Sequence, residues 1–171
     1  ARLILAEELA RAQAFQECVD ERGFIGDLNK SIVYTEQREF EYNNNPEPAK
    51  ETRLTQTSQY QRSKKVSSNA LLKAGFLCEV NSEHPVFVRK NSNENYTEPH
   101  HLVPLFAQKD FPNVNLDREQ NIVSLCSHCH NLLHYGADID GVLYKLYMDR
   151  KDLLQLIGIE ISYEDLKKYY L

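Results

Sequence analysis

Five of the six histidines in this 171-residue chain lie between positions 100 and 134. His130 and His134 are four residues apart, so on a helix their side chains share one face and can bind the same metal ion. His100 and His101 are adjacent, and neighbours on a regular strand point to opposite faces. Both can serve one site only where the backbone leaves the pleat, which the prolines around the pair favour. Because imidazole binds metals and acts as a base near neutral pH, the segment predicts a site that uses histidine for both roles.

Cysteines form a second group of potential ligands. Cys126 and Cys129 make a C-x-x-C pair, a spacing typical of metal or redox sites, and the histidine-rich surroundings favour a metal. A closed tetrahedral zinc site needs two further ligands, and Cys78 and His84 are the candidates upstream. The alternatives left open are a buried thiol at Cys78, and water or a nearby glutamate in place of His84.

The elements that must position these side chains are short. Residues 85–90 and 96–103 are strand-like and enclose a turn-rich loop, so they predict a hairpin. Residues 121–125 are predicted as a further strand, and residues 127–135 as a helix that ends at Gly136. The ligand-bearing residues therefore belong to a compact strand and helix unit.

Helical patterns flank this unit on both sides, at residues 3–19, 66–74, 142–157 and 163–170. Ser162 and Asp165 have the spacing of a helix cap for the last of these. Residues 41–63 are polar and contain two prolines, which predicts a linker.

Composition limits the cellular setting. The chain is 42% hydrophobic and 26% charged, which is ordinary for a globular protein and argues against general disorder. No apolar run is long enough to cross a membrane, and no signal peptide is evident at the first residues. We therefore expect a cytoplasmic protein with no membrane partner, whose cysteines are not paired in disulfides.

The charge is distributed unevenly. The formal net charge is −5, which by itself argues against a nucleic-acid partner. Residues 50–73, however, hold six basic groups and one acid, directly before the cysteine- and histidine-rich part. This segment predicts contacts with DNA phosphates, with Arg62, Lys64 and Lys65 as candidates, and a solvated linker is the alternative.

Taken together in order along the chain, residues 96–136 resemble the HNH endonuclease motif of the ββα-metal nuclease fold. The family pattern is an acidic residue before a histidine pair, an asparagine that opens the second strand, and histidines on the following helix. These positions are held here by Glu98, His100, His101, Asn121, His130 and His134. The flanking cysteines are similar to those of the zinc-stapled branch of the family.

The resemblance implies a role for each position. His101 is the general base that activates water, and Asn121 holds the loop that presents it. Glu98 orients a histidine or the water of the site. The catalytic divalent cation is bound by His100 and His130, with His134 as a third ligand.

The identity of the catalytic metal stays open between Mg²⁺, Mn²⁺, Ni²⁺, Co²⁺ and Zn²⁺. Many family members have an aspartate at the position of His100. Nitrogen ligands favour Zn²⁺, Ni²⁺ or Co²⁺ in affinity, whereas Mg²⁺ and Mn²⁺ prefer oxygen. A second, structural Zn²⁺ is expected at the cysteines.

The sequence thus predicts an α+β protein, with a ββα-metal core and a structural zinc flanked by N-terminal and C-terminal helices. Residues 1–49 are predicted as a helical arm and linker, or the end of an upstream domain, and residues 50–171 as the nuclease domain with its core at 76–136. The expected activity is metal-dependent hydrolysis of double-stranded DNA, of restriction or defence type. A homodimer is left open.

Two other classes of function compete with this prediction. A non-catalytic zinc module that binds nucleic acid keeps the four zinc ligands but gives the tandem histidines no role. A structural or protein-interaction domain fits the acidic charge but not the density of metal ligands. Mutation of His101 separates the first of these from an enzyme, because a binding module does not need that residue.

Overall fold

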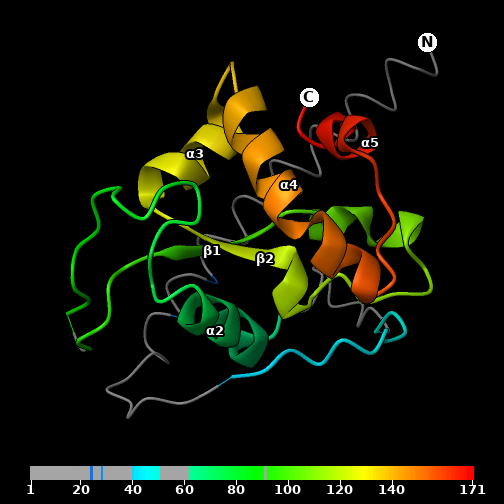
Figure 1. The fold of residues 1–171 in the computed structure, drawn as a ribbon, viewed down its shortest axis with the longest axis horizontal. Coiled ribbons are helices and arrows are strands. Elements are labelled where there is room, and N and C mark those ends of the chain that lie inside the picture. The colour runs from blue at the N-terminus through cyan, green and yellow to red at the C-terminus, as the bar shows by residue number, and fades with distance from the viewer. Residues whose placement is uncertain (1–23, 25–27, 29–39, 51–61, 91) are drawn as a thin grey trace, which may run out of the picture.

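A two-stranded antiparallel sheet lies at the centre of the computed structural model, in which residues 24, 28, 40–50, 62–90 and 92–171 are described (Figure 1). Strand β1 spans Glu98–His101 and strand β2 spans Ile122–Leu125. His100 pairs with Val123 and His101 with Ile122, and both strands are buried along their whole length. The mixed α and β class predicted from the sequence is confirmed.

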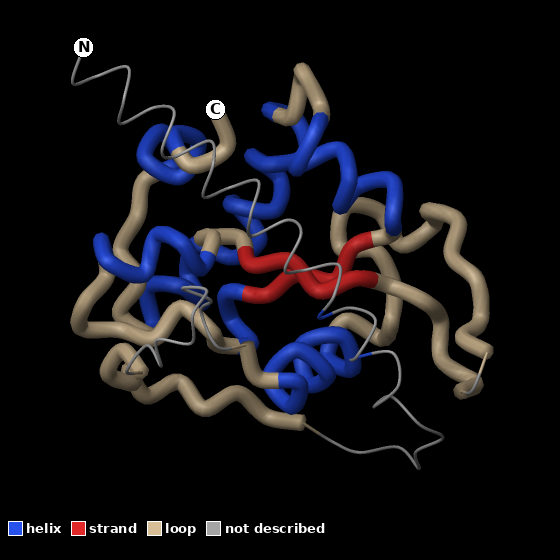
Figure 2. The backbone as a smooth tube through the Cα atoms, turned by 180° about the vertical axis from the view of Figure 1, so that it is seen from behind, coloured by secondary structure: helices blue, strands red, loops and turns tan. Residues whose placement is uncertain are grey.

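Helices cover both faces of the sheet. Helix α2, at Lys64–Lys73, lies on one side of the strands, while α3, at Ser127–Tyr135, and α4, at Asp140–Leu156, lie on the other (Figure 1). Figure 2 shows the same layers from behind. Within residues 62–90 and 92–171, the remaining elements are the short helix α5 and two 3-10 helices, at Tyr163–Lys168 (α5), Leu105–Asp110 (η1) and Glu119–Asn121 (η2).

Local signals set the helix ends. The Ser63 hydroxyl accepts a hydrogen bond of 3.3 Å from the backbone N–H of Val66 at the start of α2. As predicted, Ser162 caps α5 by accepting from the Asp165 N–H at 3.1 Å. Gly75 adopts a φ of 63°, a left-handed conformation that favours glycine, just beyond the end of α2. The four described helices fall where the sequence predicts them, with ends shifted by a few residues, while the helix predicted at 3–19 lies outside the described residues.

The main hydrophobic core lies between the sheet and the helices of the second layer. It is built from buried side chains of the strands, the connecting loop and the last three helices, including Leu102, Val123, Leu125, Leu133, Leu143, Leu154 and Leu166. A smaller cluster joins Leu71 of α2 to Leu28 and Phe76. Across the described residues, no helix combines the length and apolar character needed to cross a bilayer.

The predicted hairpin forms only in part. Residues 85–90 do not form a strand, and their link to the following segment is a single bridge between Val88 and Asn95. This bridge consists of two backbone hydrogen bonds, from the N–H of Arg89 to the carbonyl of Glu94 and from the N–H of Tyr96 to the carbonyl of Phe87. Phe87 and Val88 are both exposed, at 63% and 60%, so no apolar face is buried that would extend the sheet.

Residues 41–50, part of the polar stretch 41–63 predicted as a linker, are attached to the core. The carbonyl of Glu47 accepts from the N–H of Asn115 at 2.9 Å, and the carbonyl of Asn45 accepts from the Arg118 guanidinium at 3.0 Å. The amide of Gln120 adds a bond of 3.0 Å to the carbonyl of Asn43. The backbone carbonyls of these residues, predicted as part of a linker, therefore satisfy polar groups of the core.

Candidate functional site

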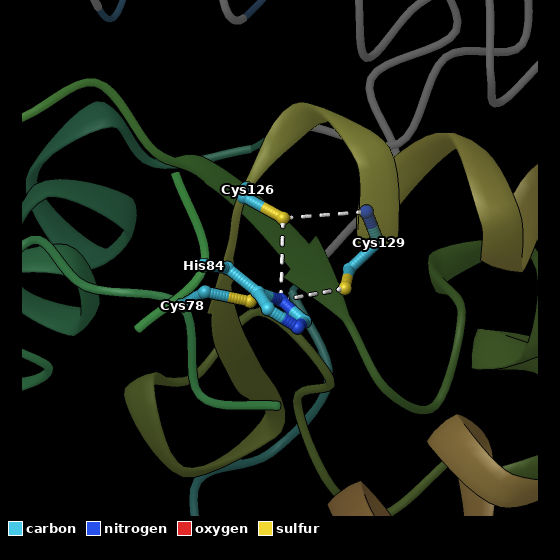
Figure 3. A group of neighbouring side chains, drawn as sticks. All are labelled: Cys78, His84, Cys126 and Cys129. Carbon is cyan, nitrogen blue, oxygen red and sulfur yellow. Dashed lines mark hydrogen bonds between the residues drawn. The ribbon is translucent and has the colours of Figure 1, made fainter. Parts of the chain in front are cut away.

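Cys78, His84, Cys126 and Cys129 meet in one cluster, with their side chains pointing to one another (Figure 3). Their ligand atoms lie within 4.8 Å of each other, and Nδ1 of His84 is 3.3 Å from the Cys129 sulfur and 3.7 Å from the Cys126 sulfur. Four ligands around a zinc ion, at bonds of about 2.0–2.3 Å, are separated by roughly 3.3–3.8 Å. This Cys₃His cluster can therefore bind a metal ion, and its donor set is compatible with zinc.

Local structure brings the two halves of this cluster together. Cys126 is the N-cap of α3, and its sulfur accepts from the backbone N–H of Cys129 at 3.5 Å. The segment that contains Cys78 lies beside β2, because the N–H of Glu79 donates to the carbonyl of Ser124 at 2.8 Å. The cluster thus ties the loop after α2 to the junction of β2 and α3.

The thiols of the cluster influence one another. Burial raises the pKa of the Cys78 thiol, but hydrogen bonds from backbone groups, Cys126 first, outweigh this effect and bring the pKa to about 7. Burial raises the pKa of Cys129, and the negative charge of Cys78 raises it further. Several thiolates in one buried site repel each other, and a divalent cation is the group that relieves this repulsion.

A second cluster gathers His100 of β1 with His130 and His134 of α3. The ring centroids lie 4.8–5.2 Å apart, and the Nε2 atoms of His130 and His134 are separated by 3.1 Å. A metal ion with bonds of about 2.0–2.1 Å to nitrogen holds neighbouring ligands roughly 2.9–3.4 Å apart. The three imidazoles therefore have the spacing of ligands to one ion.

Glu98 fixes the orientation of His130. One carboxylate oxygen contacts Nδ1 of His130, which leaves Nε2 directed at His134. The other oxygen accepts from the hydroxyls of Tyr96 and Ser127, each at 2.9 Å. Burial raises the pKa of the Glu98 carboxyl, but these hydrogen bonds and the contact with His130 outweigh it and lower the pKa below its usual range. Glu98 is therefore held as a carboxylate behind the histidine.

His100 has its own supporting residue, Tyr170. The tyrosine hydroxyl lies 2.9 Å from Nε2 of His100 and 2.7 Å from the carbonyl of Leu102, to which it donates. No motif in the sequence points to Tyr170. Tyr170 is 70 positions away from His100, and no local pattern marks a tyrosine after a short helix as a partner of a distant histidine.

His101 stands apart from the three-histidine cluster. Strand β1 keeps its regular register through both histidines, so the expected departure from the pleat does not occur. Nε2 of His101 instead lies 3.0 Å from a carboxylate oxygen of Asp117, and the two side chains are 2% and 4% exposed. Asp117 also went unnoticed in the sequence, where it is one of several acids in a polar loop.

Asn121 is the last residue of η2, directly before β2, and its side chain holds the loop that follows His101. Its side-chain oxygen accepts from the N–H of Val103 at 2.8 Å. Its side-chain nitrogen donates to the carbonyls of Val103 and Leu116, each at 2.9 Å. The residue is completely buried, so this one side chain bridges the two ends of the loop between the strands.

The candidate DNA-contacting residues lie at the beginning of α2. Lys64 and Lys65 are exposed in the first turn of the helix, and Arg62 is half-buried just before it. The backbone N–H of Ser63 donates to the second carboxylate oxygen of Asp117 at 2.7 Å. The start of α2 is therefore joined to the residue that contacts His101.

No protein-family model matches the chain. Over 90 residues, the chain is 29% identical to the "Type IV methyl-directed restriction enzyme EcoKMcrA" of Escherichia coli strain K12. The match covers 53% of this chain and 30% of that protein. Homology at this low identity, together with the Cys/His clusters, supports a distant relationship to a restriction nuclease.

Proposed function

We propose that this protein is a metal-dependent HNH endonuclease that hydrolyses phosphodiester bonds of double-stranded DNA, in restriction or defence. The observation that carries the proposal is the convergence of His100, His130 and His134 on a strand–strand–helix unit, in which His101 is the next residue of β1 after His100. The distant similarity to a restriction enzyme supports the same activity. In this proposal β1, β2 and α3 are the ββα-metal core within 76–136, and residues 50–171 are the nuclease domain. Residues 1–49 are an arm, of which residues 43–47 are hydrogen-bonded to the core.

Hydrolysis of a phosphodiester needs a base for the attacking water and positive charge near the departing oxygen. His100, His130 and His134 would hold a divalent cation, which would supply that charge. The three imidazoles are neutral ligands, so they leave the charge of the cation undiminished. Glu98 and Tyr170 hold two of these imidazoles from behind.

His101 takes the proton from the attacking water. It is the last residue of β1, and Asn121 fixes the loop that begins directly after it. Attack on the side opposite the 3′ oxygen gives 5′-phosphate and 3′-hydroxyl ends. His100 and His101 are 3% and 2% exposed, so the proposal requires that the groups covering these rings move aside when DNA binds.

The Cys₃His cluster has a structural role in this proposal, with Zn²⁺ as its ion. Its ligands come from segments about 45 residues apart, so a bound ion contributes folding free energy by joining them. The basic residues Arg62, Lys64 and Lys65 contact DNA phosphates and supply affinity that depends on salt.

The test is plasmid cleavage with Mg²⁺, Mn²⁺, Ni²⁺ or Co²⁺, on DNA with and without modified cytosine. His101→Ala should lower the rate by about 10²–10⁴-fold without rescue by metal, because a positioned base is lost. His100→Ala should weaken binding of the catalytic ion and regain activity in excess metal. His128→Ala is the matched control, because His128 is an exposed histidine of α3 outside both clusters.

Two results would contradict the proposed roles. Rescue of His101→Ala by metal, with no rescue of His100→Ala, reverses the two assignments. DNA binding without cleavage in any metal would identify a non-catalytic zinc module instead.

A further inference from the structure

We propose that Asp117 is a positioning residue that fixes the tautomer of His101 and makes Nδ1 the atom that accepts the proton from water. This inference rests on the proposed nuclease function. It adds a residue that the sequence motif does not contain, and it assigns the reactive nitrogen of the base.

The contact between the two side chains determines where the proton of the imidazole lies. Nε2 of His101 is 3.0 Å from Oδ1 of Asp117, and both side chains are almost completely buried. A carboxylate can only accept a hydrogen bond, so Nε2 of a neutral His101 must carry the proton. Nδ1 then keeps its lone pair.

The other nitrogen is available for chemistry. Nδ1 of His101 is buried, and within the described part of the chain it has no hydrogen-bond partner. A buried polar atom without a partner is costly and calls for an explanation. A role for Nδ1 as the proton acceptor for the attacking water explains why this atom has no partner.

Hydrogen bonds fix both the side chain and the backbone of Asp117. Its Oδ2 accepts from the backbone N–H of Ser63 at 2.7 Å, while its own N–H donates to the side chain of Asn115 at 3.0 Å. Each carboxylate oxygen thus has one fixed donor, Ser63 on one side and His101 on the other. The carboxylate cannot turn away from the imidazole without leaving the Ser63 N–H unpaired.

This arrangement makes Asp117→Asn a test of the tautomer. The N–H of Ser63 requires an acceptor, so the amide oxygen of the new side chain takes that position. Its NH₂ group then faces Nε2 of His101, which must accept the hydrogen bond. The proton moves to Nδ1, and the nitrogen assigned to the reaction is blocked. The same substitution in serine protease triads costs about 10⁴-fold in turnover by the same cause.

The decisive measurement is NMR of histidine labelled with ¹⁵N in the zinc-loaded protein, at about pH 8 where an ordinary imidazole is neutral. We expect His101 protonated at Nε2 in the unmodified chain and at Nδ1 in Asp117→Asn. Cleavage should show kcat lowered by about 10²–10⁴-fold, with KM for DNA and affinity for the catalytic cation unchanged. Asp149→Asn is the control. Asp149 is an exposed acid of α4 whose carboxylate pairs with Lys145 and does not contact His101.

Each result has a definite meaning. Protonation at Nδ1 in the unmodified chain overturns the inference, even if the variant fails to fold. A variant whose tautomer is unchanged, or one whose tautomer changes while kcat does not, also overturns it. Failure of the unmodified chain to cleave DNA in any metal refutes the proposed function alone, since the tautomer is measured without cleavage.

Discussion

Asn121→Ala should destabilise the protein by an amount that can be worked out from its contacts. The side chain satisfies three backbone groups, two of Val103 and one of Leu116, through bonds of 2.8–2.9 Å. Alanine leaves all three without a partner at a fully buried position. Each orphaned group costs about 1–3 kcal/mol, and relaxation of the loop recovers part of the total, so we expect a loss of about 3–5 kcal/mol. The free energy of unfolding of such domains is about 5–15 kcal/mol, so the loss is a large fraction of the stability.

The assay is urea unfolding of the zinc-loaded protein, with the free energy obtained by linear extrapolation. Asn131→Ala is the matched control. The amide of Asn131 makes one exposed bond of 2.7 Å to the carbonyl of Ser127, so its removal should change the stability by less than about 0.5 kcal/mol. A loss below about 1 kcal/mol for Asn121→Ala would refute the idea that this side chain fixes the loop after His101.

Three further changes test other parts of the site. Cys129→Ser should unfold the nuclease core and release the structural zinc, and a soluble variant with unchanged melting and one bound zinc would contradict this. Tyr170→Phe should weaken binding of Co²⁺ at the histidine cluster by about 10-fold with the melting temperature unchanged, whereas equal affinity would show that its hydroxyl does not support His100. Reversal of Lys64 and Lys65 to glutamate should weaken DNA binding and flatten its salt dependence by about two units of slope, and an unchanged slope would mark both as a solvated face.

The parts of the fold and site that the sequence predicts are those encoded locally. Helix α3 follows from its apolar spacing and from Gly136, and the cap of α5 follows from Ser162. The same helix brings His130 next to His134, because an interval of four residues is one turn. The C-x-x-C pair at Cys126 is local for the same reason. Whether these residues act as the motif implies stays a prediction.

The supporting contacts are not local, which is why the sequence does not reveal them. Asp117 is 16 positions from His101, and Tyr170 is 70 positions from His100. Each pair meets only because the intervening chain folds back on itself. Residues 85–90 contain the β-branched and aromatic residues typical of a strand, yet a strand forms only where a neighbour pairs with it and a face is buried. The attachment of residues 41–50 depends on carbonyl groups, which every residue has and no sequence pattern marks.

Helix α3 serves both clusters through consecutive residues, Cys129 for the cysteine cluster and His130 for the histidine cluster. One residue along a helix turns the side chain by about 100°, so this step separates the two groups of ligands. Inserting or deleting one residue between Cys126 and His134 would rotate the downstream ligands away from their partners on β1. Substitutions can vary this helix, but its length between these two positions is fixed. We therefore expect differences in length among related chains to fall in the loops on either side of it.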